Sequence, residues 1–163
     1  NEIKLVEGQT AEICLEVATW VDMVSRVLLE GFVLTVDYGA ETSALYDPER
    51  VRESLVCQHR YQLNSDPLTR VGGQDITAHV DFGNLRRCGK LANFGVIGDV
   101  SLAVFLVGFG AVEDLSRDPL GAHDLRRYLG LRHLLFTEIG DAHRVILQCK
   151  GVSPIPFSLD RLG

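Results

Sequence analysis

The run Phe32 to Val36 limits the fold more than any other part of the sequence. It reads FVLTV, contains three β-branched residues in five and shows no alternation with charged residues. Such a run is typical of a strand that is buried on both faces, as in the middle of a parallel sheet. A second run, Arg144 to Gln148 (RVILQ), predicts another buried strand, and we expect both strands in one sheet.

Segments with helical spacing separate the apolar runs. Val17 to Leu28 has apolar residues one, three and four positions apart, which predicts an amphipathic helix with Gly31 as its C-cap. Another helix is expected from Asp81 to near Gly95, while Ser101 to Phe109 fits either a helix or a strand. In the helix from Asp81, the side chains expected to face inwards are Phe82, Leu85, Cys88 and Leu91. Helices that alternate with apolar strands indicate a three-layer α/β domain.

Two other regions carry weaker patterns. Ile3 to Val6 and Ala11 to Leu15 read as short extended runs, and Glu7-Gly8 between them predicts a hairpin turn. Residues 41–73 show no sustained periodicity, so we expect an irregular excursion that is either functional or hides a short helix at Pro48 to Leu55.

The stretch Gln74 to Phe82, QDITAHVDF, places polar residues at every second position. In an extended segment these side chains would share one face and form a plausible wall of a site. They are Asp75, Thr77, His79 and Asp81. The residues alone favour a plainer interpretation, in which a half-exposed strand leads into a helix with Asp81 as its N-cap.

Asp37 and Tyr38 directly follow the FVLTV run. Open α/β sheets bind ligands at the carboxyl ends of their strands, so both residues are candidates for a site. The alternative is a strand-ending turn in which Asp37 bonds to nearby backbone.

Composition and cysteine use exclude several classes. The net charge of −6, from 16 basic and 22 acidic residues, argues against nucleic acid or an anionic membrane surface as the main partner. The four cysteines form no CxxC pair and the five histidines are scattered, so no metal site is expected and a reducing, cytoplasmic setting fits best. The segment Val104 to Asp114 has only two glycines of a nucleotide-binding loop, and a helix with a glycine cap accounts for it better.

Three stretches together resemble the MidA-type methyltransferases, a family that includes a mitochondrial complex I assembly-factor arginine methyltransferase. They are GFVLTVDYG (residues 31–39), HRYQLNSDPLTRVGGQDITAHVDF (residues 59–82) and FLVGFGA (residues 105–111). The resemblance extends to AEICLEVATWV (residues 11–21) and HRVILQCKG (residues 143–151). It implies a Rossmann-like class I fold, of which residues 1–163 are the C-terminal half, with a mitochondrial location in a eukaryote.

The resemblance also implies S-adenosylmethionine as cofactor and a protein side chain such as arginine as methyl acceptor. The family's glycine-rich cofactor loop lies before the region seen here, so we expect this chain alone to bind the cofactor weakly or not at all, and its cofactor-binding residues are unknown. Carboxylates pair with a planar guanidinium in forked geometry. Asp37, Asp75 and Asp81 supply such carboxylates, and His79 or Tyr38 can orient the acceptor or accept its proton. The candidate catalytic residues are His79, Asp75 and Tyr38. The candidate substrate-binding residues are Asp37, Thr77 and Asp81.

Two other functions stay open. One is a non-catalytic interaction or assembly module that keeps part of the methyltransferase fold. The other is a hydrolase that uses His79 with Asp75 or Asp81, which ranks last because no serine or cysteine lies in a nucleophile elbow.

Overall fold

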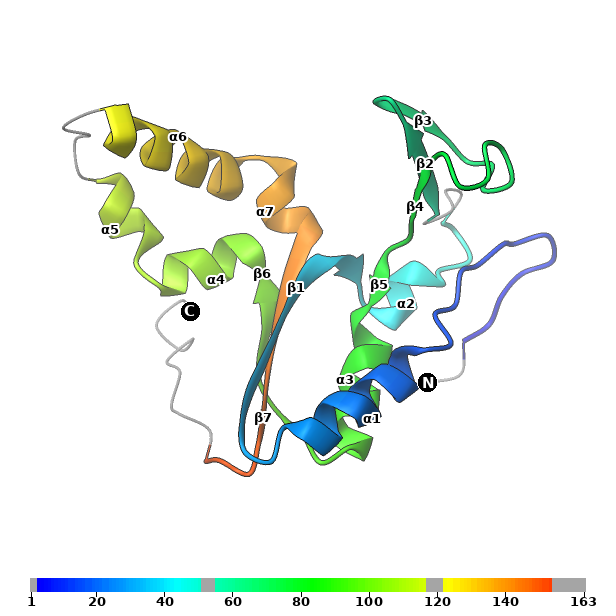
Figure 1. The fold of residues 1–163 in the computed structure, drawn as a ribbon, viewed down its shortest axis with the longest axis horizontal. Helices are drawn as coiled ribbons and strands as arrows, with labels where there is room; N and C mark the ends of the chain where they lie inside the picture. The colour runs from blue at the N-terminus through cyan, green and yellow to red at the C-terminus, as the bar shows by residue number, and fades with distance from the viewer. Residues whose placement is uncertain (1–2, 51–54, 117–121, 154–163) are drawn as a thin grey trace.

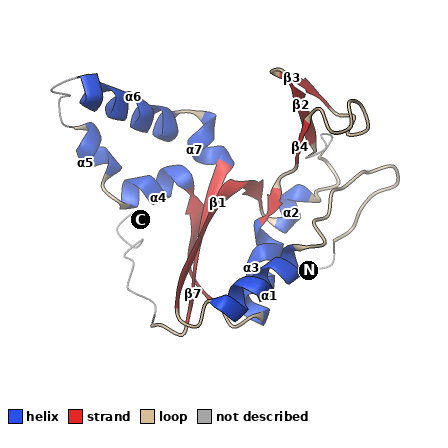
Figure 2. Cartoon of the chain, in the orientation of Figure 1, coloured by secondary structure: helices blue, strands red, loops and turns tan. Residues whose placement is uncertain are grey.

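A four-stranded sheet forms the centre of the molecule in the computed structural model, which describes residues 3–50, 55–116 and 122–153 (Figure 1). Its strand order is β5-β1-β7-β6. The strands are β1 (Gly31–Ala40), β5 (Val80–Asp81), β6 (Gly95–Ser101) and β7 (His143–Lys150). Helices lie on both sides of this sheet, as Figure 2 shows, so the expected α/β class is confirmed.

The pairing of β1 is asymmetric. Along one edge it pairs antiparallel with β7 through eight residue pairs, from Gly31 opposite Lys150 to Tyr38 opposite His143. Along the other edge only Gly39 and Ala40 pair, in parallel, with β5. A Cβ at Gly39 would lie 2.1 Å from the carbonyl oxygen of Val80, so this close parallel contact requires glycine.

The two predicted strands do lie in one sheet, but the prediction that β1 is buried on both faces was wrong. Phe32, Leu34 and Val36 are 41%, 51% and 44% exposed, and they share one face because they alternate along the strand. In β7, by contrast, Val145 and Ile146 are both buried. A continuous apolar run shows that a strand is hydrophobic, but it does not show whether another layer of the fold covers each face of that strand.

The hydrophobic core lies on the other face of β1, beneath two helices. These are α1 (Val17–Val27) and α3 (Phe82–Leu91), which pack against each other and against the sheet. The buried cluster consists of Val21, Phe82, Leu85, Cys88, Phe94 and Ile146. Both helices were predicted by their apolar spacing. However, α1 ends at Val27 with Leu28 as its C-cap, so the predicted C-cap Gly31 instead begins β1, with φ +137°. Leu91, which was expected to face inwards, is 74% exposed at the end of α3.

The amino-terminal hairpin was not found. Within residues 3–15 only the turn exists, closed by a hydrogen bond of 3.1 Å from the Gln9 N–H to the Val6 carbonyl. No strand ladder forms there, because two short runs lack a third strand or a helix that would bury one face.

The excursion at about residues 41–73 contains defined elements. After β1 comes the short helix α2 (Thr42–Leu45), and then a separate antiparallel sheet of order β3-β2-β4. Its strands are β2 (Val56–His59), β3 (Gln62–Asn64) and β4 (Asp75–Thr77). Figure 1 shows this small sheet apart from the central one. Residues 48–50 are not helical, and the remainder of the helix expected at Pro48 to Leu55 lies mostly outside the described residues.

QDITAHVDF is therefore not one strand. Asp75 to Thr77 belong to β4 in the small sheet, whereas Val80 and Asp81 belong to β5 in the central sheet. The chain leaves strand conformation at Ala78 and His79 to pass from one sheet to the other.

The last four helices lie on the opposite side of the central sheet from α1 and α3 (Figure 1). They are α4 (Leu102–Gly108), α5 (Ala111–Leu115), α6 (Ala122–Phe136) and α7 (Glu138–Ala142), and α4 and α7 contact β6 and β7. Gly110, with φ +87°, separates α4 from α5, so the glycine-capped helix predicted instead of a nucleotide loop is confirmed. None of the described helices is long and apolar enough to cross a membrane.

Candidate functional site

Three aromatic side chains meet at the carboxyl end of β1. Tyr38 lies opposite His143, the first residue of β7, with ring centroids 5.7 Å apart and an interplanar angle of 81°. His79, which directly precedes β5 at the other edge of β1, contacts Tyr38 in the same manner at 5.9 Å and 82°. We call these three residues the aromatic row.

Hydrogen bonds determine which ring nitrogens carry protons in the neutral histidines. Nη2 of Arg50 lies 3.1 Å from Nδ1 of His79, and a guanidinium only donates, so Nδ1 accepts and the proton is on Nε2. Nδ1 of His143 lies 2.9 Å from the carbonyl oxygen of Ile139, which only accepts, so Nδ1 donates and Nε2 keeps its lone pair. Within residues 3–50, 55–116 and 122–153, nothing hydrogen-bonds to Nε2 of His143.

The two imidazoles consequently offer opposite functions to a ligand. His79 presents a donor through Nε2–H, and desolvation together with the positive charge of Arg50 lowers its pKa, which keeps the ring neutral at pH 7. His143 presents an acceptor. A histidine whose Nδ1–H is held by a carbonyl is the usual arrangement for a ring that receives a proton at Nε2.

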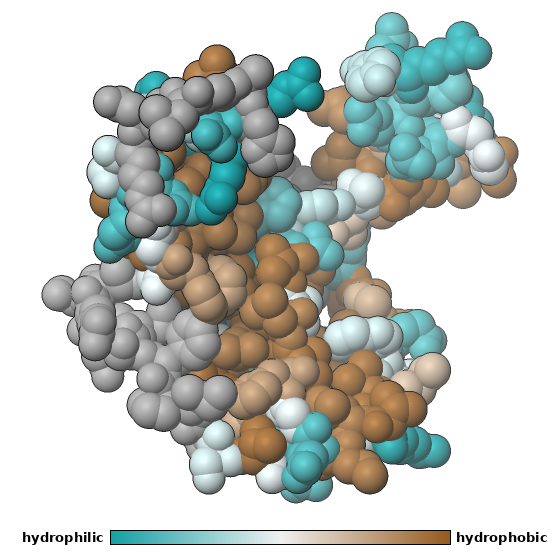
Figure 3. Space-filling view, turned by 60° about the vertical axis from the view of Figure 1, so that its left-hand side comes forward, coloured by the Kyte–Doolittle hydropathy of each residue, from teal (hydrophilic) through white to brown (hydrophobic). Residues whose placement is uncertain are grey.

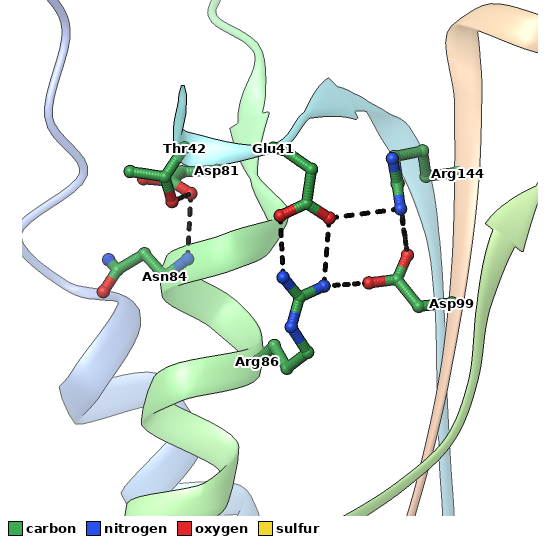
Figure 4. Close-up of polar contacts among 7 residues, drawn as sticks. All are labelled: Glu41, Thr42, Asp81, Asn84, Arg86, Asp99 and Arg144. Carbon is green, nitrogen blue, oxygen red and sulfur yellow. Dashed lines mark hydrogen bonds and ion pairs between the residues drawn. The ribbon is translucent and has the colours of Figure 1, made fainter. Parts of the chain in front are cut away.

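An ionic network lies beside the row and is shown in Figure 4. Arg86 of α3 donates two hydrogen bonds to Glu41, of 3.0 and 2.7 Å, and a further one to Asp99 of β6. Arg144 of β7 donates to Asp99 at 2.5 and 3.1 Å and forms an ion pair with Glu41 at 3.2 Å. Two guanidinium groups and two carboxylates thus form a closed and electrically neutral ring.

This network links the turn after β1 to α3, β6 and β7, so its role is structural. Its side chains are 12–36% exposed, with Asp99 the most buried. The double hydrogen bond from Arg86 is the main reason that the pKa of Glu41 lies below its ordinary value. Arg86 is therefore engaged in this network and does not lie free on a solvated helix face.

Asp81 is the N-cap of α3. Its Oδ1 accepts the backbone N–H of Asn84 at 2.8 Å and the hydroxyl of Thr42 at 2.5 Å (Figure 4). The plainer interpretation of this residue is therefore confirmed.

The other predicted site residues lie in three different settings. Asp37 is adjacent to Tyr38 but points to the opposite face of β1, where its carboxylate accepts the N–H of Tyr38 at 2.8 Å. Asp75 and Thr77 are exposed on β4, and the Thr77 hydroxyl donates to the Val56 carbonyl at 3.3 Å. Of the residues predicted as catalytic, the structure brings Tyr38 and His79 into contact.

An open cavity of about 900 Å³ lies between the amino-terminal segment, α2 and the start of α3. Asp81, Thr42, Glu41 and Arg86 border it, together with apolar residues such as Ile13. Its lining does not include Asp37, Asp75, Thr77 or His79.

Sequence reasoning missed His143 and Arg50. His143 directly precedes the strand predicted at Arg144 to Gln148, and the antiparallel pairing of β7 with β1 brings the start of one strand to the end of the other. His143 thus lay beside a recognised strand, but the sequence does not show that this strand runs antiparallel to β1. Arg50 lies in the excursion, where no pattern indicated a partner for His79.

The fold and the row define an α/β protein with a polar cluster at the carboxyl end of a central strand. A family model described as "Putative S-adenosyl-L-methionine-dependent methyltransferase" matches residues 1–99. The chain belongs to this methyltransferase family.

Two crystal structures of Burkholderia thailandensis proteins are similar to this chain. The first is an uncharacterized protein that is 28% identical, with a TM-score of 0.85 over 96% of this chain. The second, described as a "likely methyl transferase", is bound to S-adenosyl-homocysteine and is also 28% identical, with a TM-score of 0.83 over 98% of this chain. This chain spans 42% of the length of each. No curated protein sequence matches it.

Proposed function

We propose that this chain is the C-terminal part of a MidA-type methyltransferase and forms the side of the active site that receives the methyl acceptor. The acceptor is a protein side chain with a basic nitrogen, such as arginine, and the methyl donor is S-adenosylmethionine. The family match and the Burkholderia structure with bound S-adenosyl-homocysteine support the donor. We place the protein in the cytoplasm, or in the mitochondrion of a eukaryote.

The aromatic row is the observation that carries the acceptor assignment. It lies at the carboxyl end of β1, where open α/β sheets bind their ligands. A guanidinium is attracted to aromatic rings, and the partly exposed ring of Tyr38 lies at the centre of the row. A nitrogen acceptor also has to release one proton for each methyl group that it gains, and Nε2 of His143 is available to take it.

The remaining residues receive the following roles. His79 orients the acceptor through Nε2–H, and Asp37 provides negative charge at the end of β1. Asp75 and Thr77 contact the acceptor protein from the exposed face of β4, which adjoins the row through the link that carries His79. Asp81 contributes mainly by fixing the start of α3 beside the site, since its Oδ1 accepts the backbone N–H of Asn84.

The described residues do not by themselves fit the cofactor. A nucleotide-like ligand is usually held where a strand passes through a glycine-rich turn into a helix. Strands pass directly into helices here at Glu41, Asp81 and Ser101, and none of these turns is rich in glycine. The side chains of Asp81 and Ser101 also each accept one amide of the first helical turn, that of Asn84 and that of Val104. S-Adenosylmethionine therefore needs residues that correspond to the part of the relatives outside the matched region.

The test is methyl transfer by the complete enzyme that contains this chain, measured with a radiolabelled methyl donor and followed by amino-acid analysis of the acceptor. His143→Gln should lower kcat about 100-fold or more, because general-base groups contribute at least that much, and should leave donor binding unchanged. His59→Gln is the matched control, since Nδ1 of His59 also donates to a carbonyl, that of Gly73 at 2.6 Å, but in the small sheet.

Full activity of His143→Gln would overturn the role of His143. Equal losses of kcat in His143→Gln and His59→Gln would show that both substitutions act on folding and not on methyl transfer. Absence of labelled protein in the wild type would overturn the proposed function itself.

One observation favours the alternative of a non-catalytic assembly module. The exposed apolar face of β1 is the kind of surface that protein partners cover. A wild-type protein that binds S-adenosyl-homocysteine in its complete form but transfers no methyl group would favour this alternative.

A further inference from the structure

Arg50 lies at the end of a turn that several hydrogen bonds hold in place. The carbonyl oxygen of Asp47 accepts the N–H of Arg50 at 3.0 Å, and Oδ1 of Asp47 accepts the N–H of Glu49 at 2.8 Å. The side-chain amide of Gln9 donates to the same carbonyl at 3.1 Å, which ties the turn to the amino-terminal segment. The turn places Nη2 of Arg50 3.1 Å from Nδ1 of His79, 29 positions along the chain.

This contact determines what His79 can bind. A guanidinium only donates, so Nδ1 of His79 keeps its lone pair and the single ring proton is on Nε2. His79 is exposed, and none of the residues that the structure describes accepts a hydrogen bond from its Nε2–H. A ligand atom that meets this N–H therefore has to carry a lone pair.

The guanidinium of an arginine acceptor does not meet this requirement. Its five N–H groups donate and none of its atoms accepts, so against His79 it would place donor opposite donor. The nearby positive charge of Arg50 disfavours it further. At the other end of the aromatic row, Nε2 of His143 has the lone pair that a guanidinium N–H needs. The two ends of the row therefore suit different parts of the acceptor.

A main-chain carbonyl oxygen suits the end at His79, since every peptide unit of an acceptor offers one. The strands β5 and β7 flank β1, so they lie roughly 10 Å apart, and the long side chain of arginine separates its guanidinium from its main chain. We propose that Arg50 positions His79 to donate its Nε2–H to a main-chain carbonyl oxygen of the acceptor polypeptide, an inference that rests on the proposed function. The guanidinium of the acceptor is then directed to Tyr38 and His143.

The surroundings of His79 favour a neutral oxygen over a carboxylate. Desolvation and the positive charge of Arg50 lower the pKa of His79, whereas the negative charge of Glu12 raises it. Glu12 would therefore repel a carboxylate bound at this ring. Figure 3 shows the small sheet as a projecting lobe whose upper part is mostly hydrophilic, and its strand β4 leads through Ala78 to His79. A polypeptide that passes this lobe meets polar surface on its way to His79.

The first test reads the ring proton directly and does not depend on methyl transfer. Long-range ¹H–¹⁵N spectra of the complete enzyme that contains this chain, with labelled histidine and the His79 signal assigned by His79→Gln, should show the proton on Nε2 at pH 7. Arg50→Leu should give a mixture of the two tautomers, because Nδ1 loses its donor. Arg26→Leu is the matched control, since Arg26 on α1 also has a partner, Asp22 at 2.7 Å, and should leave the tautomer unchanged.

The second test uses three probes on the same labelled enzyme. They are a blocked glycine–arginine–glycine tripeptide, butylguanidine, which has the guanidinium but no carbonyl, and free L-arginine. The tripeptide should shift the Nε2–H signal of His79, whereas butylguanidine should shift only the signals of His143. Arg50→Leu should bind the tripeptide about tenfold more weakly, the worth of one neutral hydrogen bond.

An unchanged tautomer in Arg50→Leu would overturn the proposal. So would equal shifts of His79 by butylguanidine and the tripeptide, or no shift with any probe. A shift by free arginine alone would assign the site to a carboxylate instead. The probe comparison on the wild type keeps the test valid if Arg50→Leu does not fold. Absence of methyl transfer while the tripeptide still shifts His79 would count against the proposed function alone.

Discussion

Gly89 in α3 faces Gln148 of β7 at a distance that leaves no room for a side chain. A Cβ at this position would lie 2.0 Å from Nε2 of Gln148, a side chain that is 3% exposed. Gly89→Ala should therefore lower the free energy of unfolding by about 1–3 kcal/mol, because an overfilled core forces its neighbours to move. Urea denaturation of both proteins measures the difference.

Gly130 provides the control for this prediction. It lies in α6, and no other atom lies within 4 Å of the position that a Cβ would occupy. Gly130→Ala should raise the free energy of unfolding by about 1 kcal/mol, since alanine is the better helix former. Effects of the same sign at both positions would show that helix propensity, and not the contact with Gln148, decides the result.

Glu41 gives the stability a defined dependence on pH. Its pKa is lowered, chiefly by the hydrogen bonds from Arg86, so its contribution is present above its unfolded-state pKa of about 4.3 and is lost as pH falls through the folded-state value. Glu41→Gln should cost about 1–2 kcal/mol at pH 7, a modest amount for a charged but partly exposed pair.

The difference between wild type and Glu41→Gln should hold above about pH 6 and shrink progressively below about pH 4, because the carboxylate takes up its proton first in the unfolded state and only at lower pH in the folded state. Chemical denaturation over this range, with Glu7→Gln in the exposed amino-terminal turn as control, measures it. A difference that grows as pH falls would contradict the network.

At the scale of elements, the start of α3 depends on one side chain. Asp81→Ala should destabilise the protein by about 1–2 kcal/mol, because the N–H of Asn84 loses its acceptor, whereas Asp81→Asn should cost less than about 0.5 kcal/mol because asparagine caps equally well. Thermal unfolding of the two variants separates them. Equal losses would show that the charge of Asp81 matters more than the cap.

Elements with a strong pattern could be predicted from the sequence. The spacing of apolar residues predicted α1 and α3, and the apolar runs predicted β1 and β7. These patterns are visible in the sequence because each element buries apolar side chains against a neighbouring element. QDITAHVDF could not be divided correctly, because its alternation continues without interruption while the chain changes from one sheet to another at Ala78 and His79.

The candidate site was predictable only in part, for a related reason. Tyr38 and His79 come from motifs that the sequence displays, and the structure places them in contact. His143 and Arg50 join them through strand direction and a loop path, which are tertiary properties. The ring of Glu41, Arg86, Asp99 and Arg144 similarly draws one residue from each of four distant segments.

At the scale of the whole molecule, an aromatic cluster and an open strand edge lie on the same central strand, β1. The aromatic row lies at one end of β1, and the open edge runs along the rest of the strand. The described turns that lead from strands into helices, at Glu41, Asp81 and Ser101, are not rich in glycine, which supports our proposal that residues outside this chain hold the cofactor.

Titration calorimetry of this chain alone with S-adenosyl-homocysteine tests that division most directly. We expect no saturable heat at micromolar ligand, because none of the described strand-to-helix turns offers the usual cradle for a nucleotide. Tight 1:1 binding by the isolated chain would contradict it, since the cofactor site would then lie within these residues.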